Sequence, residues 1–142
     1  MQFKLKMRKS KEYYSNLIYK VNGAAIEVHK ELGPGLLESI YHKCLKYELE
    51  LRGLVVSSEM KVPVLYKEME IETNLKCDLF IENGLVLELK AIEKILPVHE
   101  AQILTYMTLL NAPIGLIINF NCTNIWKEGQ KTYVNKLYEN LI

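Results

Sequence analysis

The chain has 142 residues and a formal net charge of +1 at pH 7, with 49% hydrophobic and 25% charged residues. A chain of this size can bury one core, and its composition excludes a disordered protein. Its longest uncharged stretch, residues 101–126, contains several polar side chains, which argues against a membrane-spanning helix.

The charges are unevenly distributed along the chain. Residues 1–20 carry six Lys or Arg and one Glu, whereas residues 21–126 carry nine Lys or Arg and fourteen Asp or Glu. A protein that holds nucleic acid by charge alone is normally basic throughout, so the acidic residues 21–126 would need a metal ion in order to bind phosphates. We expect a basic N-terminal arm at residues 1–16, which either contacts phosphates or only aids solubility, followed by a single domain at residues 17–142.

The three cysteines indicate a reducing compartment. Cys44, Cys77 and Cys122 are far apart in the sequence and form no CxxC pair. This pattern supports neither a disulfide framework nor a zinc site, and it is typical of small buried hydrophobic residues. No apolar run follows the basic first residues, so no secretory signal is predicted. We therefore expect a cytoplasmic protein that does not contact a membrane.

Hydrophobic periodicity and turn residues divide the chain into helices and strands. In chain order we expect helices at residues 17–32 and 36–51, strands at 60–66, 76–81 and 85–91, a helix at 98–110 and a strand at 114–120. The last strand is almost entirely apolar, as is typical of a strand covered on both faces. The segment at residues 132–137 is compatible with either strand or helix. This order predicts an α/β fold with a mixed sheet flanked by helices.

The turn between the second and third strands decides which side chains share a face of the sheet. Asp78 precedes this turn and Glu88 follows it. A two-residue loop at Asn83 and Gly84 would put the two carboxylates on opposite faces, whereas a three-residue loop at residues 82–84 pairs Asp78 with Glu88. We predict the three-residue loop, because Gly84 then occupies its third position, where a left-handed backbone is favoured.

The predicted register gathers charge on one patch of the sheet. Glu88 and Lys90 share a face because side chains alternate along a strand, and Asp78 lies opposite Glu88. Two carboxylates about 4 Å apart repel by about 4 kcal/mol at an effective dielectric constant near 20, and a divalent cation removes this repulsion. The alternatives are a solvated strand face or charges that only pair with one another. We favour a site, because the strand is otherwise apolar and buried charge needs a partner or a function.

Residues 35–41, GLLESIY, contain the pattern G-x-x-E-x-x-Y. Together with the segments AAIEVHKELGPGLLESIY, ELKA, PVHEAQILTY and LIINF, this pattern resembles the GxxExxY family, a branch of the PD-(D/E)XK nuclease superfamily. The resemblance covers about residues 17–137. The resemblance implies a restriction-endonuclease-like core, with a central mixed four- to five-stranded sheet flanked by helices in the order α-α-β-β-β-α-β.

The resemblance also implies a metal site. Asp78 and Glu88 would coordinate Mg²⁺ or Mn²⁺, with the Leu89 carbonyl as a third ligand. Glu38 would bind the metal directly or through water. Cys77 occupies the position before Asp78 where the superfamily's name places a proline, a departure that changes no ligand.

The remaining matched residues would surround the metal. Lys90 would orient the attacking water, and Gln102 would position Lys90 or a phosphate. Tyr41 and Tyr106 would lie at the edge of the site. The implied function is metal-dependent hydrolysis of phosphodiester bonds in DNA, or else in RNA. The alternative is a catalytically silent relative that binds nucleic acid or a protein partner, and either form is compatible with a homo-oligomer.

Overall fold

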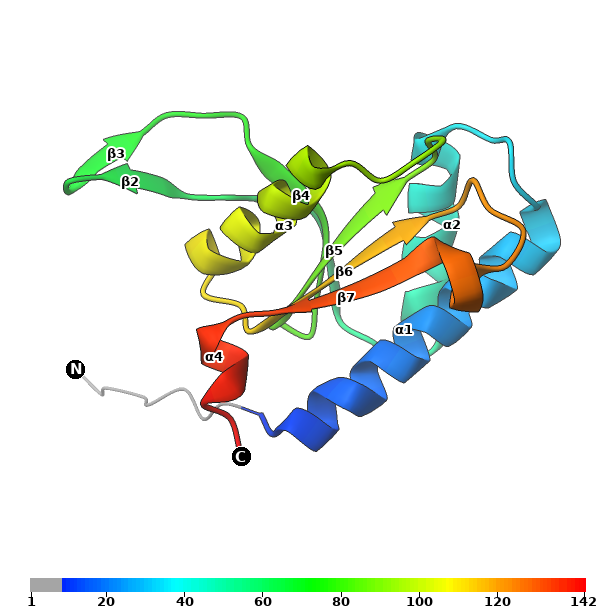
Figure 1. Cartoon of the computed structure of the whole chain (residues 1–142), viewed down its shortest axis with the longest axis horizontal. Helices are drawn as coiled ribbons and strands as arrows, with labels where there is room; N and C mark the ends of the chain where they lie inside the picture. Colours follow the sequence, from blue (N-terminus) through cyan, green and yellow to red (C-terminus); the bar gives the residue numbers. More distant parts are fainter. Residues whose placement is uncertain (1–8) are drawn as a thin grey trace.

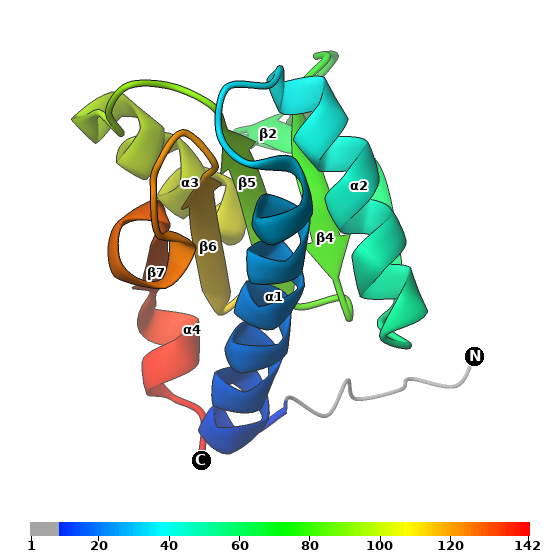
Figure 2. The same ribbon diagram turned by 90° about the vertical axis from the view of Figure 1, so that its right-hand side faces the viewer.

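The computed structural model describes residues 9–142, which form three layers. A five-stranded sheet lies between α1 and α2 on one face and α3 on the other (Figures 1 and 2). The strand order is β1-β4-β5-β6-β7, in which β5 and β6 are parallel and the other neighbours are antiparallel. The predicted mixed sheet flanked by helices is confirmed. The elements are α1 Lys11–Leu32, α2 Glu38–Leu51, β1 Val56–Lys61, β2 Val64–Tyr66, β3 Met69–Ile71, β4 Lys76–Ile81, β5 Leu85–Lys90, α3 Pro97–Leu109, β6 Ile114–Asn119, η1 Ile125–Gly129, β7 Gln130–Val134 and α4 Lys136–Glu139.

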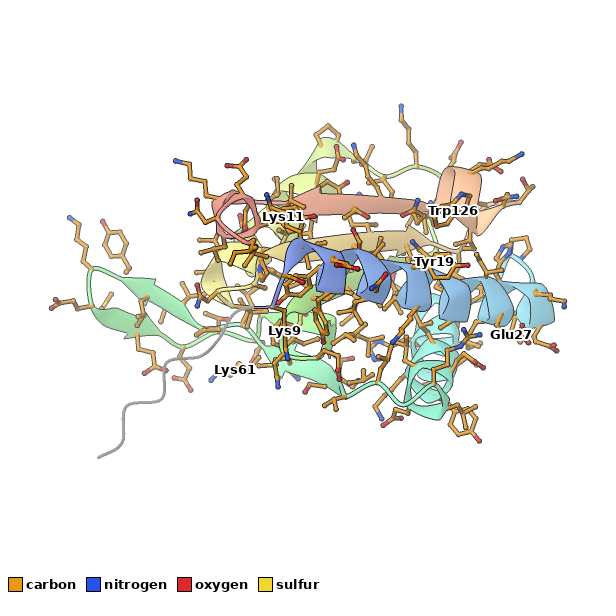
Figure 3. The ribbon with its side chains drawn as sticks, turned by 90° about the horizontal axis from the view of Figure 1, so that it is seen from below. Lys9, Lys11, Tyr19, Glu27, Lys61 and Trp126 are labelled. Carbon is orange, nitrogen blue, oxygen red and sulfur yellow. The ribbon has the colours of Figure 1, made fainter. Side chains whose placement is uncertain are left out.

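The first helix begins earlier than the periodicity predicts. α1 starts at Lys11 rather than at residue 17, because the Ser10 side chain accepts a hydrogen bond from the Tyr13 N–H at 3.1 Å and caps the helix. Figure 3 shows Lys9 and Lys11 at this end of α1. The end of the expected basic arm is therefore helical, and its residues 1–8 lie outside the described residues. No helix in the described part of the chain combines the length and the apolar character that a bilayer crossing needs.

The segment between α2 and β4 differs most from the prediction. The sequence predicts one strand at residues 60–66, but β1 ends at Lys61 and β2 pairs only with β3 in a separate two-stranded ribbon. Pro63 lies between β1 and β2, and proline has no N–H to donate to a strand ladder. The ribbon extends away from the five-stranded sheet (Figure 1).

The C-terminal segment that the sequence left open contains both a strand and a helix. β7 ends at Val134 and the short helix α4 begins at Lys136. The π-helical turn η1 precedes β7 and is absent from the prediction. Its last residue, Gly129, packs so closely that a Cβ there would lie 2.8 Å from the Asn119 carbonyl oxygen.

Buried side chains fill both sides of the sheet. Leu79, Leu87 and other apolar side chains pack against α1 and α2, whereas Val86 and Ile117 pack against α3. Because side chains alternate along β5, Glu88 lies on the α3 side with Val86. The acidic residue of β5 therefore lies in the layer between the sheet and α3.

A small residue in β6 keeps α3 close to this layer. A Cβ at Gly115 would lie 2.7 Å from Met107 Sδ and 3.0 Å from Ile103 Cδ1, both in α3. We expect Gly115→Ala to lower the free energy of unfolding by about 1–3 kcal/mol, the usual cost of overpacking a core. Urea denaturation followed by circular dichroism measures this change.

The matched control is the same substitution in α1. A Cβ at Gly23 would meet only the flexible end of Arg52, at 3.2 Å. Because alanine is the better helix former, Gly23→Ala should leave stability unchanged or raise it by up to about 1 kcal/mol. Equal effects of the two substitutions would contradict the close packing of α3 on β6.

Candidate functional site

The turn between β4 and β5 gives the predicted register through a different backbone conformation. Ile81 pairs with Leu85, which confirms the three-residue loop. The left-handed residues are Glu82, with φ 51°, and Asn83, with φ 54°, so the prediction that Gly84 takes this conformation is wrong. A glycine is still required at that position, because a Cβ would lie 2.5 Å from the hydroxyl of a tyrosine in α1.

Asp78 and Glu88 are held together by reciprocal hydrogen bonds. The Asp78 N–H donates to Glu88 Oε2 at 2.8 Å, and the Leu89 N–H donates to Asp78 Oδ2 at 2.8 Å. Glu88 is only 4% exposed, whereas Asp78 is half-buried. The two carboxylates therefore form one site, with Glu88 as its more deeply buried part.

The strand pairing is interrupted at Asp78 on both sides. β1 pairs with β4 before and after Glu59 but not at Glu59 itself, which would face Asp78 and has φ 54°. The pairing of β4 with β5 ends at Leu79 and Leu87. A left-handed conformation costs a non-glycine residue about 1–2 kcal/mol, and such strain is concentrated at functional sites. No pattern in the sequence marks Glu59, because its distinguishing feature is a backbone angle.

Burial and the neighbouring Asp78 carboxylate disfavour the ionised form of Glu88. Desolvation and then the Asp78 carboxylate raise the pKa of Glu88 to about 8, although Lys90 acts in the opposite direction. Desolvation, Glu88 and Asp78 also raise the pKa of the Cys77 thiol to about 12. Lys90 takes part in none of the ion pairs formed within residues 9–142, so the charges do not neutralise one another by direct contact.

Glu38 faces the pair from another element but does not join it. It is the exposed first residue of α2, and its pKa is raised by partial desolvation and then by Asp78, while Lys90 and His42 lower it. Within residues 9–142, no three Asp, Glu, His or Cys side chains lie close enough together to hold a metal ion. The structure thus brings Asp78 and Glu88 into contact and leaves Glu38 outside this contact.

Tyr41 fixes the loop that leads to Glu38. Its ring is fully buried and stacks on Phe120 with the ring centroids 4.3 Å apart. Its hydroxyl donates to the Gly33 carbonyl and accepts a hydrogen bond from the Leu36 N–H at 3.2 Å. The tyrosine of the G-x-x-E-x-x-Y pattern therefore holds the turn that precedes α2 and positions the glutamate of the pattern.

α3 contributes Gln102 and Tyr106 on the Glu88 side of the sheet. Gln102 is exposed, and its Nε2 donates to the Tyr106 hydroxyl at 3.3 Å. Tyr106 is 5% exposed, and its pKa is raised by burial and then by the negative charge of Glu88. The predicted one-turn spacing thus joins the two side chains, and the charge of Glu88 reaches Tyr106.

Sequence reasoning missed two further contacts around the site. Asn119 is buried and holds the segment after Lys90, because its Oδ1 accepts from the Ile92 N–H at 3.1 Å and its Nδ2 donates to the Ile92 carbonyl at 2.9 Å. His42 Nε2 lies 2.8 Å from Ser58 Oγ. The sequence does contain a signal for the Asn119 contact, because an amide side chain stands at the end of an otherwise apolar strand.

The donor set fits a hard divalent cation. Asp78 and Glu88 supply carboxylate oxygens, and the Leu89 carbonyl points toward β4 because it shares a side of the strand with the Leu89 N–H. Mg²⁺ is commonly bound by one or two carboxylates and keeps several waters, so a third grouped carboxylate is not required. A cation would also favour the ionised form of Glu88, which the protein alone disfavours.

Comparison with known protein families identifies a superfamily for this chain. The family model described as the PD-(D/E)XK nuclease superfamily matches residues 15–132, which include α2, Asp78, Glu88 and α3. No curated protein and no solved structure matches the chain.

The raised pKa of Glu88 makes the stability of the metal-free protein depend on pH. Because its pKa rises from 4.5 to about 8 on folding, the folded state binds the proton more tightly, and stability falls as pH rises between these values. Gln at this position keeps an acceptor for the Asp78 N–H without the charge. We expect Glu88→Gln to raise the free energy of unfolding by at least about 1.4 kcal/mol at about pH 9, the equivalent of one pKa unit.

Urea denaturation in EDTA across this pH range measures the effect. The exposed Glu93, in the loop after β5, provides the control Glu93→Gln. Parallel stability profiles of the wild type and both variants would contradict the description of Glu88.

Proposed function

Because the chain belongs to the PD-(D/E)XK nuclease superfamily, we propose that it hydrolyses phosphodiester bonds of DNA with the help of Mg²⁺ or Mn²⁺. The superfamily match covers residues 15–132. The observation that carries the proposal is the reciprocal contact of Asp78 and Glu88, which leaves a buried carboxylate in need of positive charge. Lys90 follows two residues after Glu88 and therefore points to the same face of β5.

The proposal gives the metal ligands and the cation defined roles. Asp78, Glu88 and the Leu89 carbonyl would hold the cation, and Glu38 would bind it directly or through water. The cation supplies Lewis-acid stabilisation of the negative charge that develops on the phosphate. During hydrolysis the water oxygen bonds to phosphorus and its proton passes to solvent, while the bond to the leaving sugar oxygen breaks and that oxygen takes up a proton from solvent.

The surrounding side chains orient the reactants. The Lys90 ammonium holds the attacking water and stabilises charge on the phosphate. Gln102, which is exposed and bonded to Tyr106, contacts a phosphate oxygen. Tyr41 acts at a distance by fixing the start of α2.

The G-x-x-E-x-x-Y pattern supports membership of the GxxExxY branch. The three free cysteines are compatible with a cytoplasmic location.

A catalytically silent relative is the second candidate. Such a protein would bind nucleic acid or a protein partner, as a monomer or a homo-oligomer. The observation that favours it is that no third potential ligand groups with Asp78 and Glu88 within the described residues.

Cleavage assays separate the two candidates. We expect the wild type to cleave DNA in Mn²⁺, and we expect Asp78→Ala and Lys90→Ala to reduce the rate by at least about 100-fold, the usual loss when a charge-stabilising group is removed. Lys94→Ala is the control, because Lys94 is exposed in the loop after β5. Equal cleavage by all four proteins would exclude this mechanism, and metal binding without cleavage by the wild type would favour the silent relative.

Thermal melting tests the metal site independently of cleavage. A cation that binds only the folded state at about 100 times its Kd stabilises it by about 2.7 kcal/mol. We expect Mn²⁺ to raise the Tm of the wild type and not of Asp78→Asn. Glu70→Gln, in the exposed ribbon, should respond like the wild type. A wild-type Tm that is indifferent to Mn²⁺ would refute the site.

A further inference from the structure

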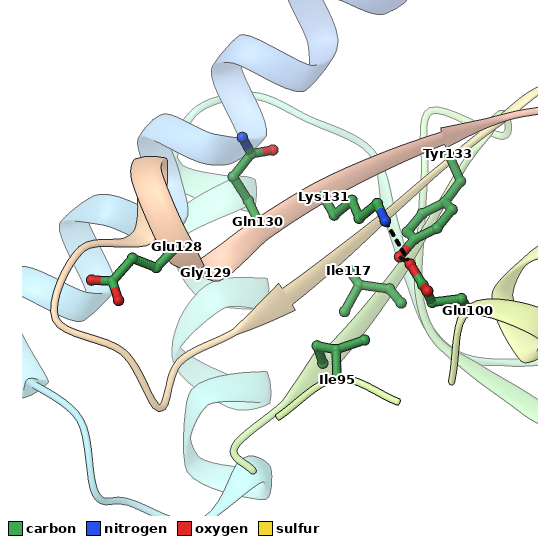
Figure 4. Close-up of a pocket in the computed structure, with 8 residues that line it drawn as sticks. All are labelled: Ile95, Glu100, Ile117, Glu128, Gly129, Gln130, Lys131 and Tyr133. Carbon is green, nitrogen blue, oxygen red and sulfur yellow. Dashed lines mark hydrogen bonds and ion pairs between the residues drawn. The ribbon is translucent and has the colours of Figure 1, made fainter. Parts of the chain in front are cut away.

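A pocket of about 270 Å³ adjoins the candidate site on the same face of the sheet. It lies between the start of α3, the loop that precedes α3, and strands β6 and β7 (Figure 4). Its lining includes Ile95, Glu100, Ile117, Gln130, Lys131 and Tyr133. None of these residues belongs to the acidic pair itself.

The strand register connects this pocket to the acidic pair. Glu88 pairs with Ile117 across β5 and β6, and Ile117 pairs with Lys131 across β6 and β7. Residues paired in this way share a face, so Asp78, Glu88, Ile117 and Lys131 form one row across the sheet. Neighbouring strands lie about 4.8 Å apart, which places the Lys131 backbone roughly 10 Å from that of Glu88.

The pocket holds an anionic and a cationic side chain that contact each other. Glu100 Oε2 accepts hydrogen bonds from Lys131 Nζ at 2.8 Å and from the Tyr133 hydroxyl. Figure 4 shows these three side chains converging, with Ile95 and Ile117 beside them. A charged acceptor and a charged donor next to an apolar wall complement a flat ring that carries donors and acceptors along its edge.

The exposure of the ion pair predicts a small contribution to the stability of the fold. The Lys131 side chain is 65% exposed and that of Glu100 is 32% exposed. Exposed pairs of this kind contribute little to folding. The pocket is poorly suited to another phosphate of the substrate. Lys131 is the only lysine in the lining of the described pocket, and the negatively charged Glu100 carboxylate lies against it.

We propose that this pocket binds one unpaired nucleobase of the substrate, beside the phosphate that is cleaved. This inference rests on the proposed function, and it assigns Glu100 and Lys131 to specificity. Guanine fits best, because its N1–H and N2–H groups donate to a carboxylate while its O6 accepts from a lysine. A base within a duplex uses this edge for its own partner, so the preferred substrate is single-stranded at this nucleotide.

Equilibrium binding tests the pocket without relying on cleavage. The probe is a fluorescein-labelled oligothymidine that contains one central guanine, and its counterparts carry thymine or an abasic site there. We expect the Lys90→Ala protein in Mg²⁺ to bind the guanine probe at least about five-fold more tightly than either counterpart, the lower range for a bidentate base contact. Fluorescence anisotropy at fixed salt measures the three Kd values.

A double substitution identifies the residues responsible. Adding Glu100→Gln and Lys131→Met to the Lys90→Ala protein should abolish the guanine preference without changing the Tm. A preference that persists in this variant, or equal Kd values in its parent, would overturn the inference. Wild-type cleavage in Mn²⁺ is scored separately: guanine preference without cleavage refutes only the nuclease proposal, and cleavage without guanine preference refutes only the base pocket.

Discussion

The contact between two carboxylates across β4 and β5 governs the organisation of this end of the molecule. The Glu88 carboxylate accepts a hydrogen bond from the Asp78 N–H, and the Asp78 carboxylate accepts one from the Leu89 N–H. These two bonds stand where the strands would otherwise be joined by backbone hydrogen bonds. This arrangement satisfies two polar groups but concentrates negative charge in a layer that is otherwise apolar. The raised pKa of Glu88 follows from this conflict. Proteins retain such unfavourable groups where activity requires them, at some expense to stability.

The rest of the fold supports that contact from several directions. The left-handed Glu59 interrupts the regular pairing of β1 with β4 beside Asp78. Tyr41 holds the loop that begins α2, and Asn119 holds the segment that leaves β5. Gly115 lets α3 approach the sheet on the Glu88 side. None of the hydrogen bonds formed within residues 9–142 joins these residues to either carboxylate, so they act on the pair through the backbone and the packing.

Local patterns in the sequence predicted the sheet and the pair, because strand periodicity and a three-residue turn determine the register. They failed where tertiary contacts decide the backbone. The left-handed conformations fall at Glu82 and Asn83 rather than at Gly84, and β2 leaves the sheet after Pro63. The position of Glu38 relative to the pair depends on how α2 packs, which no spacing encodes. The row of side chains from Asp78 to Lys131 depends on the register of four strands, which the sequence alone does not determine.

The ribbon formed by β2 and β3 is attached to the domain at a narrow base. The Val62 N–H donates to the Leu75 carbonyl at 2.9 Å, and this bond closes the excursion between β1 and β4. Leu65, Tyr66 and Met69 on the ribbon are largely exposed, and a two-stranded hairpin has little stability of its own. Evolution or engineering can therefore shorten, lengthen or replace this appendage while the pairing of β4 with β5 and the contact between Asp78 and Glu88 are kept.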